Sequence, residues 1–362
     1  MKILVATDAW VPQVNGVLAT YRRLAEELPA LGSQLTFLTP EHFGTVATPW
    51  YREIRLAVPN RRKAAAIIDA DDADHIHIAT EGPVGWMARN YCRRRRLPFT
   101  TSFHTRFPEY AAQHFGLPKT LVYAGLRRFH NAGAGVMVAT PSLQRELTRR
   151  GFRNLLPWTR GVDTTLFSPR ADRMFGSEKP VFLYVGRVSI EKNIEAFLTS
   201  DLPGIKVVVG DGPHLAALVE RFPDVRFLGR RTGEDLARHF ASADVFVFPS
   251  RTDTFGLVIL EAMASGVPVA AYPVTGPIDI VDDGISGILD ENLASAARRA
   301  LSLDRVSVRR RALDFTWRRT AEMFVENIRY ARSSTSPVRS LPAASARSAK
   351  TQTCGAAATR RT

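Results

Sequence analysis

Short apolar runs alternate with amphipathic helical stretches along most of this 362-residue chain, and this alternation constrains the fold more than any other feature. In the first half we expect strands at residues 2–6, 34–38, 75–78, 99–102 and 136–139. In the second half we expect strands at residues 181–185, 205–209, 225–228, 245–248 and 267–271. Strands that alternate with helices form parallel sheets with helices on both faces. The pattern therefore predicts an α/β chain of two Rossmann-like, doubly wound domains.

The alternation pauses at residues 159–180, where glycine and proline occur without hydrophobic periodicity. We place a linker there and expect a first domain at 1–165 and a second at 166–310. A helical pattern follows at 311–332, for which packing back onto the first domain is one option. Residues 333–362 contain no acid and mostly small or polar side chains, which predicts a disordered basic tail. Two such domains around a linker predict a ligand cleft between them.

Segment 249–268 (PSRTDTFGLVILEAMASGVP) combines an apolar strand end, a polar loop and a helix that we expect to start near residue 255. Asp253 lies in the loop, and Glu261 follows eight residues later on the helix. Amides at a helix N-terminus are unpaired donors that suit an anion or sugar hydroxyls. Here those amides belong to Phe255, Gly256 and Leu257. The alternative is that Asp253 and Thr252 simply cap the helix.

A second segment, VFLYVGRVSIEKN at 181–193, places two cations after a strand. Gly186 is followed by Arg187, and Lys192 comes five residues later at the start of a helical pattern. Two cations beside a helix N-terminus suit a diphosphate. The alternative is a solvated pair of surface cations.

Two strand ends of the first half also carry polar side chains, and ligands gather at strand ends in doubly wound sheets. One group consists of His104, Arg106 and Tyr110, and Glu81 follows another strand. Glu81 is equally compatible with a helix cap. As a lone histidine, His104 is also compatible with a structural role. After the first strand, Asn15 is placed to cap a helix, and Gly16 would let a phosphate or sugar approach the backbone.

These segments together resemble the retaining family-4 glycosyltransferases of the GT-B fold. Segment 249–268 is similar to the E-x7-E signature, in which the first acid lies near the donor sugar and the second holds the nucleotide ribose. Asp253 stands where the family has glutamate. Segment 181–193 resembles the family's pyrophosphate-binding G-R-x4-K, and Gly16 its glycine loop. A histidine placed like His104 contacts the donor sugar in that family. The turn with Gly212 resembles its G-D-G-P turn beside the nucleotide, and Arg230 would approach the base or ribose.

The resemblance implies transfer of a hexose from a UDP- or GDP-sugar with retained anomeric configuration. It implies no metal ion and no cofactor, because Arg187 and Lys192 would neutralise the departing diphosphate. The catalytic group would be Asp253, His104, Arg187 and Lys192. The acceptor would contact Glu81, His104, Arg106 and Tyr110. The chain is similar both to bacterial glycolipid synthases, which suggests a lipid acceptor such as diacylglycerol, and to GDP-mannose-dependent α-mannosyltransferases, which suggests a glycan or another acceptor.

The chain carries 49 basic and 35 acidic side chains, a net charge of +14. Residues 1–165 have a net charge of +9, residues 166–332 are neutral, and residues 333–362 carry +5. The half with the best motifs is therefore neutral, and no nucleic-acid-binding module is recognisable, so we expect no nucleic-acid partner. Basic and apolar side chains mix in 117–129, which suits either an interfacial helix on an anionic membrane or a buried helix with a basic edge.

No run of about 20 apolar residues is uninterrupted, so the sequence favours a cytoplasmic protein, with peripheral attachment to the inner face of the membrane as an option. A nucleotide-sugar epimerase on the same architecture and a basic nucleic-acid binder remain as alternative functions. A nicotinamide dehydrogenase is disfavoured because no G-x-G-x-x-G follows the first strand.

Overall fold

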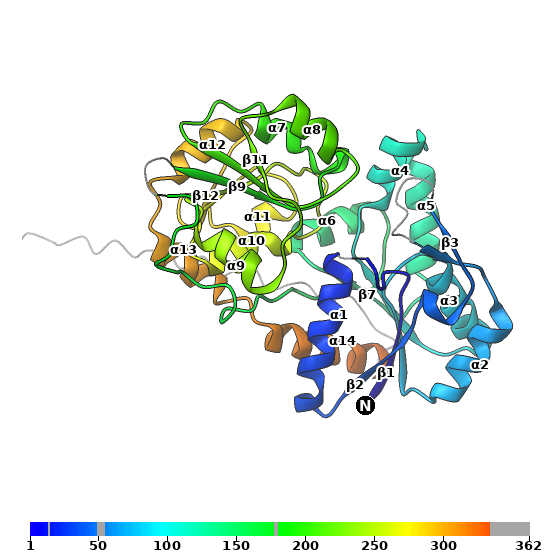
Figure 1. The fold of residues 1–362 in the computed structure, drawn as a ribbon. Coiled ribbons are helices and arrows are strands. Elements are labelled where there is room, and N and C mark those ends of the chain that lie inside the picture. Colours follow the sequence, from blue (N-terminus) through cyan, green and yellow to red (C-terminus); the bar gives the residue numbers. More distant parts are fainter. Residues whose placement is uncertain (14, 49–54, 177–179, 334–362) are drawn as a thin grey trace, which may run out of the picture.

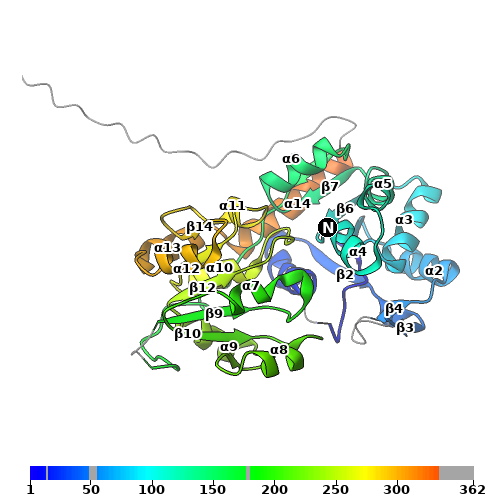
Figure 2. The same cartoon turned by 90° about the horizontal axis from the view of Figure 1, so that it is seen from above.

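The computed structural model describes residues 1–13, 15–48, 55–176 and 180–333. They form two α/β domains that stand side by side, as Figure 1 and the view from above in Figure 2 show. This confirms the predicted fold class. The disordered tail expected at 333–362 lies outside the described residues except for Ser333, which ends the last helix.

The first domain is built on a six-stranded sheet in which all neighbours are parallel. Its order is β2 (Gln34–Leu38), β1 (Lys2–Ala6), β5 (His75–Ile78), β6 (Phe99–Phe103), β7 (Gly135–Val138) and β8 (Leu155–Pro157). Its helices are α1 (Gly16–Glu27), α2 (Arg61–Asp71), α3 (Pro83–Arg95), α4 (Phe107–Phe115), α5 (Lys119–His130) and α6 (Pro141–Arg149). Two 3₁₀ turns, η1 (Leu28–Leu31) and η2 (Pro40–His42), and an antiparallel pair, β3 (Thr45–Ala47) and β4 (Arg55–Ala57), complete it.

The second domain repeats the plan with another parallel six-stranded sheet. Its order is β11 (Arg226–Phe227), β10 (Ile205–Val209), β9 (Val181–Val185), β12 (Val245–Phe248), β13 (Val269–Ala271) and β14 (Gly287–Leu289). Its helical elements are η3 (Ile190–Lys192), α7 (Ile194–Leu198), α8 (Leu215–Arg221), α9 (Gly233–Ala241), α10 (Leu257–Ala264), α11 (Pro277–Ile280), α12 (Leu293–Ala300) and α13 (Arg305–Ala312).

Most predicted strands occur within a residue or two of their expected bounds, but two differences have a clear physical cause. The helical pattern expected to start at Lys192 is split into η3 and α7, because Asn193 adopts a left-handed conformation with φ of 52°. The edge strand β11 spans only two residues, and the hairpin β3–β4 and the edge strands β8 and β14 were not predicted. Short strands carry too few apolar residues to stand out as a pattern.

The last helix, α14 (Trp317–Ser333), leaves the second domain and packs beside α1 of the first (Figure 1). Its buried Phe324 and Ile328 share a cluster with Ile3 and Val5 of β1. The linker touches the start of this helix so closely that a Cβ on Gly161 would lie 2.3 Å from the Trp317 nitrogen. Helix α14 therefore fastens the second domain to the first. No helix within the described ranges has the length and apolarity to cross a membrane.

Strand order locates the ligand crevices. In the first sheet the chain leaves β1 toward β2 on one side and later returns to β5 on the other, and β9, flanked by β10 and β12, repeats this arrangement. Where strand order reverses in this way, the loops after adjacent strands run in opposite directions. They leave a crevice at the carboxyl ends of the strands. The loops after β1, β9 and β12 carry most of the motifs singled out from the sequence.

Candidate active site

A cleft of about 1230 Å³ lies between the two domains, lined by the loops after β1 and β6 on one side and by those after β9, β10 and β12 on the other. Of the predicted site residues, most line this cleft: Gly16, His104, Arg106, Gly186, Arg187, Lys192, Gly212, Arg230, Asp253, Phe255, Gly256, Leu257 and Glu261. The fold thus brings together in space residues from position 16 to position 261.

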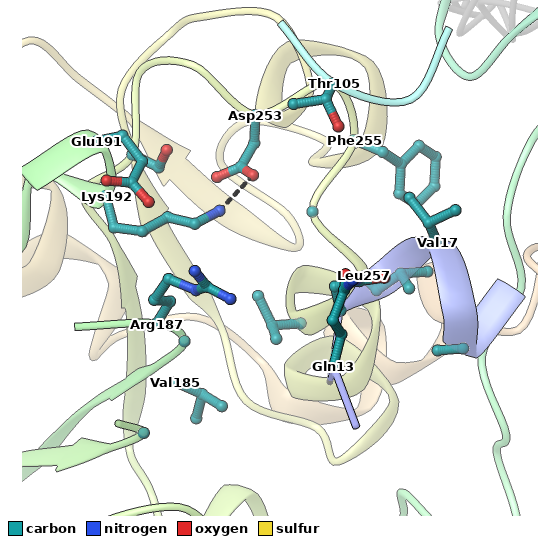
Figure 3. A pocket seen from close by; sticks show the side chains of 18 of the residues that line it. Gln13, Val17, Thr105, Val185, Arg187, Glu191, Lys192, Asp253, Phe255 and Leu257 are labelled. Atoms are coloured by element: carbon teal, nitrogen blue, oxygen red, sulfur yellow. Dashed lines mark hydrogen bonds and ion pairs between the residues drawn. The ribbon is translucent and has the colours of Figure 1, made fainter. Parts of the chain in front are cut away.

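Lys192 and Asp253 form an ion pair in the wall of the cleft (Figure 3), with 2.6 Å between the lysine Nζ and the carboxylate Oδ1. Burial alone would raise the pKa of Asp253, but the Lys192 charge and hydrogen bond, together with Ser250 and Arg106, hold it below its usual value. The second oxygen, Oδ2, is buried and has no hydrogen-bond partner among the described residues. An ionised carboxylate with one free oxygen is ready to accept a hydrogen bond from a ligand hydroxyl.

The capping alternative for Asp253 and Thr252 is wrong. Across the described residues no side chain caps the N-terminus of α10, where Gly256 is the N-cap with φ of 100°. The Thr252 hydroxyl instead donates to the Glu191 carbonyl at 3.2 Å. The terminal amides of α10 are thus left without a side-chain acceptor at the edge of the cleft.

Arg187 lies two residues after the end of β9, and its side chain projects into the same cavity as Lys192 and Asp253 (Figure 3). The backbone there is fixed by the Tyr184 hydroxyl, which donates to the Arg187 carbonyl at 2.7 Å. Arg187 and Lys192 thus line a cleft, and a carboxylate pairs with Lys192. This placement argues against the alternative of a solvated pair of surface cations.

Glu261 faces the cleft from α10, one turn beyond the N-terminus of the helix. Burial raises the pKa of Glu261 to about 7, and no cation among the described residues compensates the desolvation of its carboxylate. Two carboxylates eight residues apart therefore differ in charge state near neutral pH: Asp253 is ionised, whereas Glu261 titrates.

The glycines of the site permit close approach of backbones. A Cβ on Gly212 would lie 2.3 Å from the Val188 carbonyl oxygen, so this glycine is required for packing between the turns after β9 and β10. Gly16 opens α1, where Asn15 accepts a hydrogen bond from the Leu18 amide at 2.9 Å, as expected of a cap. A Cβ on Gly16 would lie 3.3 Å from Leu257 of the other domain. The N-termini of α1 and α10 therefore meet across the cleft.

His104 directly follows β6. At this residue the first domain contacts the loop of the second domain that carries Asp253. Its carbonyl accepts a hydrogen bond from the Thr254 hydroxyl at 2.6 Å. Its ring nitrogens contact Arg160 and Tyr21 at 3.1 Å each. Burial, followed by the Arg160 charge, lowers the pKa of His104 well below its usual value. The imidazole is neutral at physiological pH.

The remaining predicted acceptor residues are placed differently. Arg106 lines the cleft and forms an ion pair with Glu146 of α6. Glu81 does not line it: it borders a separate pocket of about 320 Å³ and pairs with His130 at 3.0 Å. Glu81 does not cap α3 either, since Asp8 accepts the Val84 amide there. Tyr110 belongs to α4, and its side chain lies outside what the structure describes.

Family comparisons divide the chain on either side of the linker. Residues 14–166 match the model "Glycosyltransferase Family 4", and residues 179–303 match the model "Glycosyl transferases group 1". The chain belongs to the GT-B glycosyltransferases.

Among curated proteins, this glycosyltransferase is 29% identical over 318 residues to the GDP-mannose-dependent alpha-mannosyltransferase of Corynebacterium glutamicum, covering 80% of this chain and 76% of that one. It is 26% identical over 347 residues to the alpha-monoglucosyldiacylglycerol synthase of Streptococcus pneumoniae, covering 83% and 78%.

Two solved structures share the fold of this glycosyltransferase. Sucrose-phosphate synthase of Thermosynechococcus elongatus superposes with a TM-score of 0.74 at 23% identity, covering 91% of this chain and 98% of that one. The Anabaena protein HepE in complex with UDP-glucose superposes with a TM-score of 0.69 at 17% identity, covering 91% and 99%.

Sequence reasoning missed three residues of the glycosyltransferase cleft or its wall. Asp8, two residues after the end of β1, lines the cleft while capping α3, and burial raises its pKa to about 6. Its position at a strand end was a usable signal. Tyr21 reads as an ordinary apolar position of an amphipathic helix, and Arg160 lies in a linker without periodicity. Their roles depend on contacts with His104 that only the folded chain creates.

Proposed function

We propose that this glycosyltransferase moves a hexose, with its anomeric configuration retained, from a UDP- or GDP-sugar to a membrane lipid such as diacylglycerol. The supporting observation is the Lys192–Asp253 pair, which lies with Arg187 in the cleft facing the first domain. Two cations and a carboxylate with one free oxygen match a diphosphate joined to a sugar. The general function, glycosyl transfer from a nucleotide sugar, is common to the relatives.

In the proposed reaction Arg187 and Lys192 hold the diphosphate, and their attraction grows as negative charge develops on the leaving oxygen. Glu261 holds the ribose hydroxyls, and Asp253 accepts a hydroxyl of the transferred sugar through Oδ2. The bond between the anomeric carbon and the diphosphate breaks while the acceptor oxygen bonds to the same face of that carbon. The leaving phosphate takes the acceptor's proton, so no protein nucleophile is required.

The proposal includes independence of metal ions, because two protein cations supply the charge that a metal would otherwise provide. We expect turnover with excess EDTA to equal turnover with added Mg²⁺ within about twofold, whereas loss of a metal acting as Lewis acid would remove several kcal/mol of transition-state stabilisation. Initial rates in both buffers measure this. An EDTA-inactivated enzyme that Mg²⁺ or Mn²⁺ restores would refute metal independence while leaving glycosyl transfer intact.

The lipid acceptor is supported by the surface of α4 and α5, which adjoin Arg106 at the edge of the cleft. Phe107, Leu117 and Leu121 are 43%, 47% and 69% exposed there. Lys119, Arg127 and Arg128 are exposed on the same helix pair. The inner side of α5 is buried through Tyr123, Leu126 and Phe129, so the buried-helix alternative explains that side but not the exposed leucines. Such a surface suits peripheral attachment to the inner face of a membrane.

Leu121→Asp should weaken binding to anionic vesicles. It replaces the most exposed apolar side chain of this surface with a negative charge, which the negatively charged lipid headgroups repel. We expect flotation with vesicles of phosphatidylglycerol at low salt to fall at least about fivefold, from the loss of a leucine's transfer energy plus repulsion. Val306→Asp on α13 is the matched control, since Val306 is 67% exposed and lies on the other domain. Equal flotation of both variants, or no flotation of the wild type, would argue against the membrane surface.

The second candidate is GDP-mannose-dependent mannosyl transfer to a glycan or another acceptor, which the name of the Corynebacterium relative favours. A donor screen by thermal unfolding separates the two. The true donor at 100 times its Kd should raise the free energy of unfolding by about 2.7 kcal/mol. Product analysis with diacylglycerol and with mannosides then identifies the acceptor. Recovery of an epimerised donor without any transfer would instead indicate an epimerase.

A further inference from the structure

A chain of hydrogen bonds runs from the cleft into the buried interior of the first domain. Arg160 contacts Nδ1 of His104 at 3.1 Å, and Nε2 of the same ring contacts the Tyr21 hydroxyl at 3.1 Å. The Tyr21 hydroxyl also contacts Nε2 of His77 at 2.8 Å, and Nδ1 of His77 contacts the Thr100 hydroxyl at 2.8 Å. These hydrogen bonds thus connect the wall of the cleft to the linker, to α1 and to strands β5 and β6.

Donor and acceptor chemistry fixes the direction of the hydrogen bonds at the His104 end of this chain. Beyond Tyr21 the Ser102 hydroxyl also contacts Tyr21, at 3.3 Å, and His77, at 2.9 Å. A guanidinium can only donate, so Nδ1 of His104 must carry a lone pair and accept from Arg160. The ring proton of neutral His104 is then on Nε2 and is donated to Tyr21. The Tyr21 hydroxyl can donate in turn to His77, because burial raises the pKa of Tyr21 and keeps its proton in place. Protonating Nδ1 of His104 would set two donors against each other.

Arg160 is a buried cation, as Arg89 is. It is 4% exposed, and no carboxylate among the described residues forms an ion pair with it. Its guanidinium donates to the carbonyls of Trp158 at 2.7 Å and Thr159 at 2.9 Å, and lies 4.0 Å from the centre of the Trp158 ring. Burial lowers the pKa of Arg160 to about 10, which still leaves it charged at neutral pH. No carboxylate among the described residues therefore neutralises the Arg160 charge that lies next to His104.

We propose that Arg160 is a positioning residue for glycosyl transfer, which holds His104 neutral with Nδ1 as acceptor so that the ring keeps one fixed hydrogen-bonding pattern beside the donor sugar. The catalytic relevance of this inference rests on the proposed function. The ring position itself does not, since it follows from the contacts of the free protein.

The groups around His104 all act in the same direction. Arg160 in the linker, His77 on β5 and His130 at the end of α5 each disfavour a positive charge on this ring. The neutral Tyr21 hydroxyl on α1 faces Nε2, and Thr254 of the second domain binds the His104 carbonyl. Of these groups only Arg160 carries a full charge and contacts the ring. Its replacement should therefore alter the titration of His104 most.

Two substitutions separate charge from hydrogen bonding. Arg160→Gln leaves an amide that can donate to Nδ1 but removes the charge, whereas Arg160→Met removes both. Arg309→Gln is the matched control, because Arg309 also donates to linker carbonyls, at 3.1 Å to both Thr164 and Phe167, but contacts no histidine whose side chain the structure describes. Thermal unfolding of all three variants measures the cost of losing contacts to the linker.

The test is nitrogen NMR of ¹⁵N-histidine-labelled full-length protein, with the His104 signals assigned by their loss in His104→Gln. We expect wild-type His104 to stay neutral, with its proton on Nε2, across the pH range in which an ordinary histidine titrates. In Arg160→Met the pKa of the ring should rise toward its usual value, because the neighbouring charge is removed while burial remains. The value of kcat/KM should fall about 10²-fold at pH 7.5 from misplacement of the ring and decline further toward acid. Arg160→Gln should keep more activity than Arg160→Met but show the same acid decline.

Two results would overturn the proposal: a wild-type ring protonated on Nδ1, or an unchanged His104 titration in Arg160→Met. An Arg160→Met variant that matches Arg309→Gln in stability, rate and pH profile would assign Arg160 a structural role only. If the protein transfers no sugar at all, the NMR experiment still tests the position of the His104 proton. Failure of the proposed function can therefore be distinguished from failure of this inference.

Discussion

Lys192→Ala should lower kcat/KM for glycosyl transfer by about 10²–10³-fold, the usual effect of removing one preorganised partner of a developing negative charge. Lys192 lies in the cleft at 2.6 Å from Asp253 and beside Arg187. Its removal deletes a cation that stabilises the departing diphosphate, and also the main counter-charge of a buried carboxylate. Because the pKa of Asp253 would then rise, we expect activity to fall further as the pH is lowered toward 5, which steady-state rates at several pH values measure.

Lys63→Ala is the control, since Lys63 is exposed on α2 and outside the cleft. It should retain wild-type kcat/KM. Asp253→Asn tests the other half of the pair: it keeps the size of the side chain but removes the charge that Lys192 faces. Full activity of Lys192→Ala, with the wild type active in the same assay, would remove Lys192 from the diphosphate site.

Glu261→Gln should raise the KM for the donor by about 10–100-fold, because hydrogen bonds between ribose hydroxyls and a charged acceptor contribute about 1.5–3 kcal/mol each. The wild-type pH dependence follows from the pKa of Glu261, which burial raises to about 7. Only the ionised carboxylate accepts from both hydroxyls, so the donor KM of the wild type should rise as the pH falls below 7. In Glu261→Gln this rise should be absent.

The same substitution should stabilise the free protein. The pKa of Glu261 is higher in the folded chain than its usual value of 4.5, so the folded state favours the protonated form. The free energy of unfolding therefore falls as the pH rises from 4.5 through 7, by on the order of 1–3 kcal/mol from this group. Glu261→Gln removes that loss above pH 7 and changes little below pH 4.5.

Urea unfolding at pH 5 and pH 8 measures the difference, with Glu220→Gln on the exposed face of α8 as the control. A Glu261→Gln protein that binds donor normally would contradict the ribose assignment. One that is less stable than the wild type at pH 8 would contradict the account of its buried carboxylate.

The layered fold was predictable because buried parallel strands have a simple sequence pattern. β1, β9 and β12 occur where the apolar runs placed them, and the loops after them contain Arg187 and Asp253. The hairpin β3–β4 and the edge strands β8 and β14 were missed because strands of three residues carry almost no periodicity. The break at Asn193 depends on one left-handed residue that no apolar pattern reveals.

Within the site, residues in local motifs were predictable and those that act through distant contacts were not. The sequence grouped Lys192 with Arg187, but the 2.6 Å pair with Asp253 joins residues 61 positions apart. Glu81 shows the opposite error, since a strand-end position suggested the cleft whereas the chain turns it toward His130. Arg160 belongs to a linker segment to which the sequence assigned no site role, and only its contact with His104 gives it one.

The structure of this protein with bound UDP or GDP tests the central claim most directly. We expect the nucleotide in the cleft between the domains, with its diphosphate against Arg187 and Lys192 and its ribose hydroxyls on Glu261. A nucleotide that binds elsewhere, or that occupies the cleft with its diphosphate away from both cations, would contradict the account.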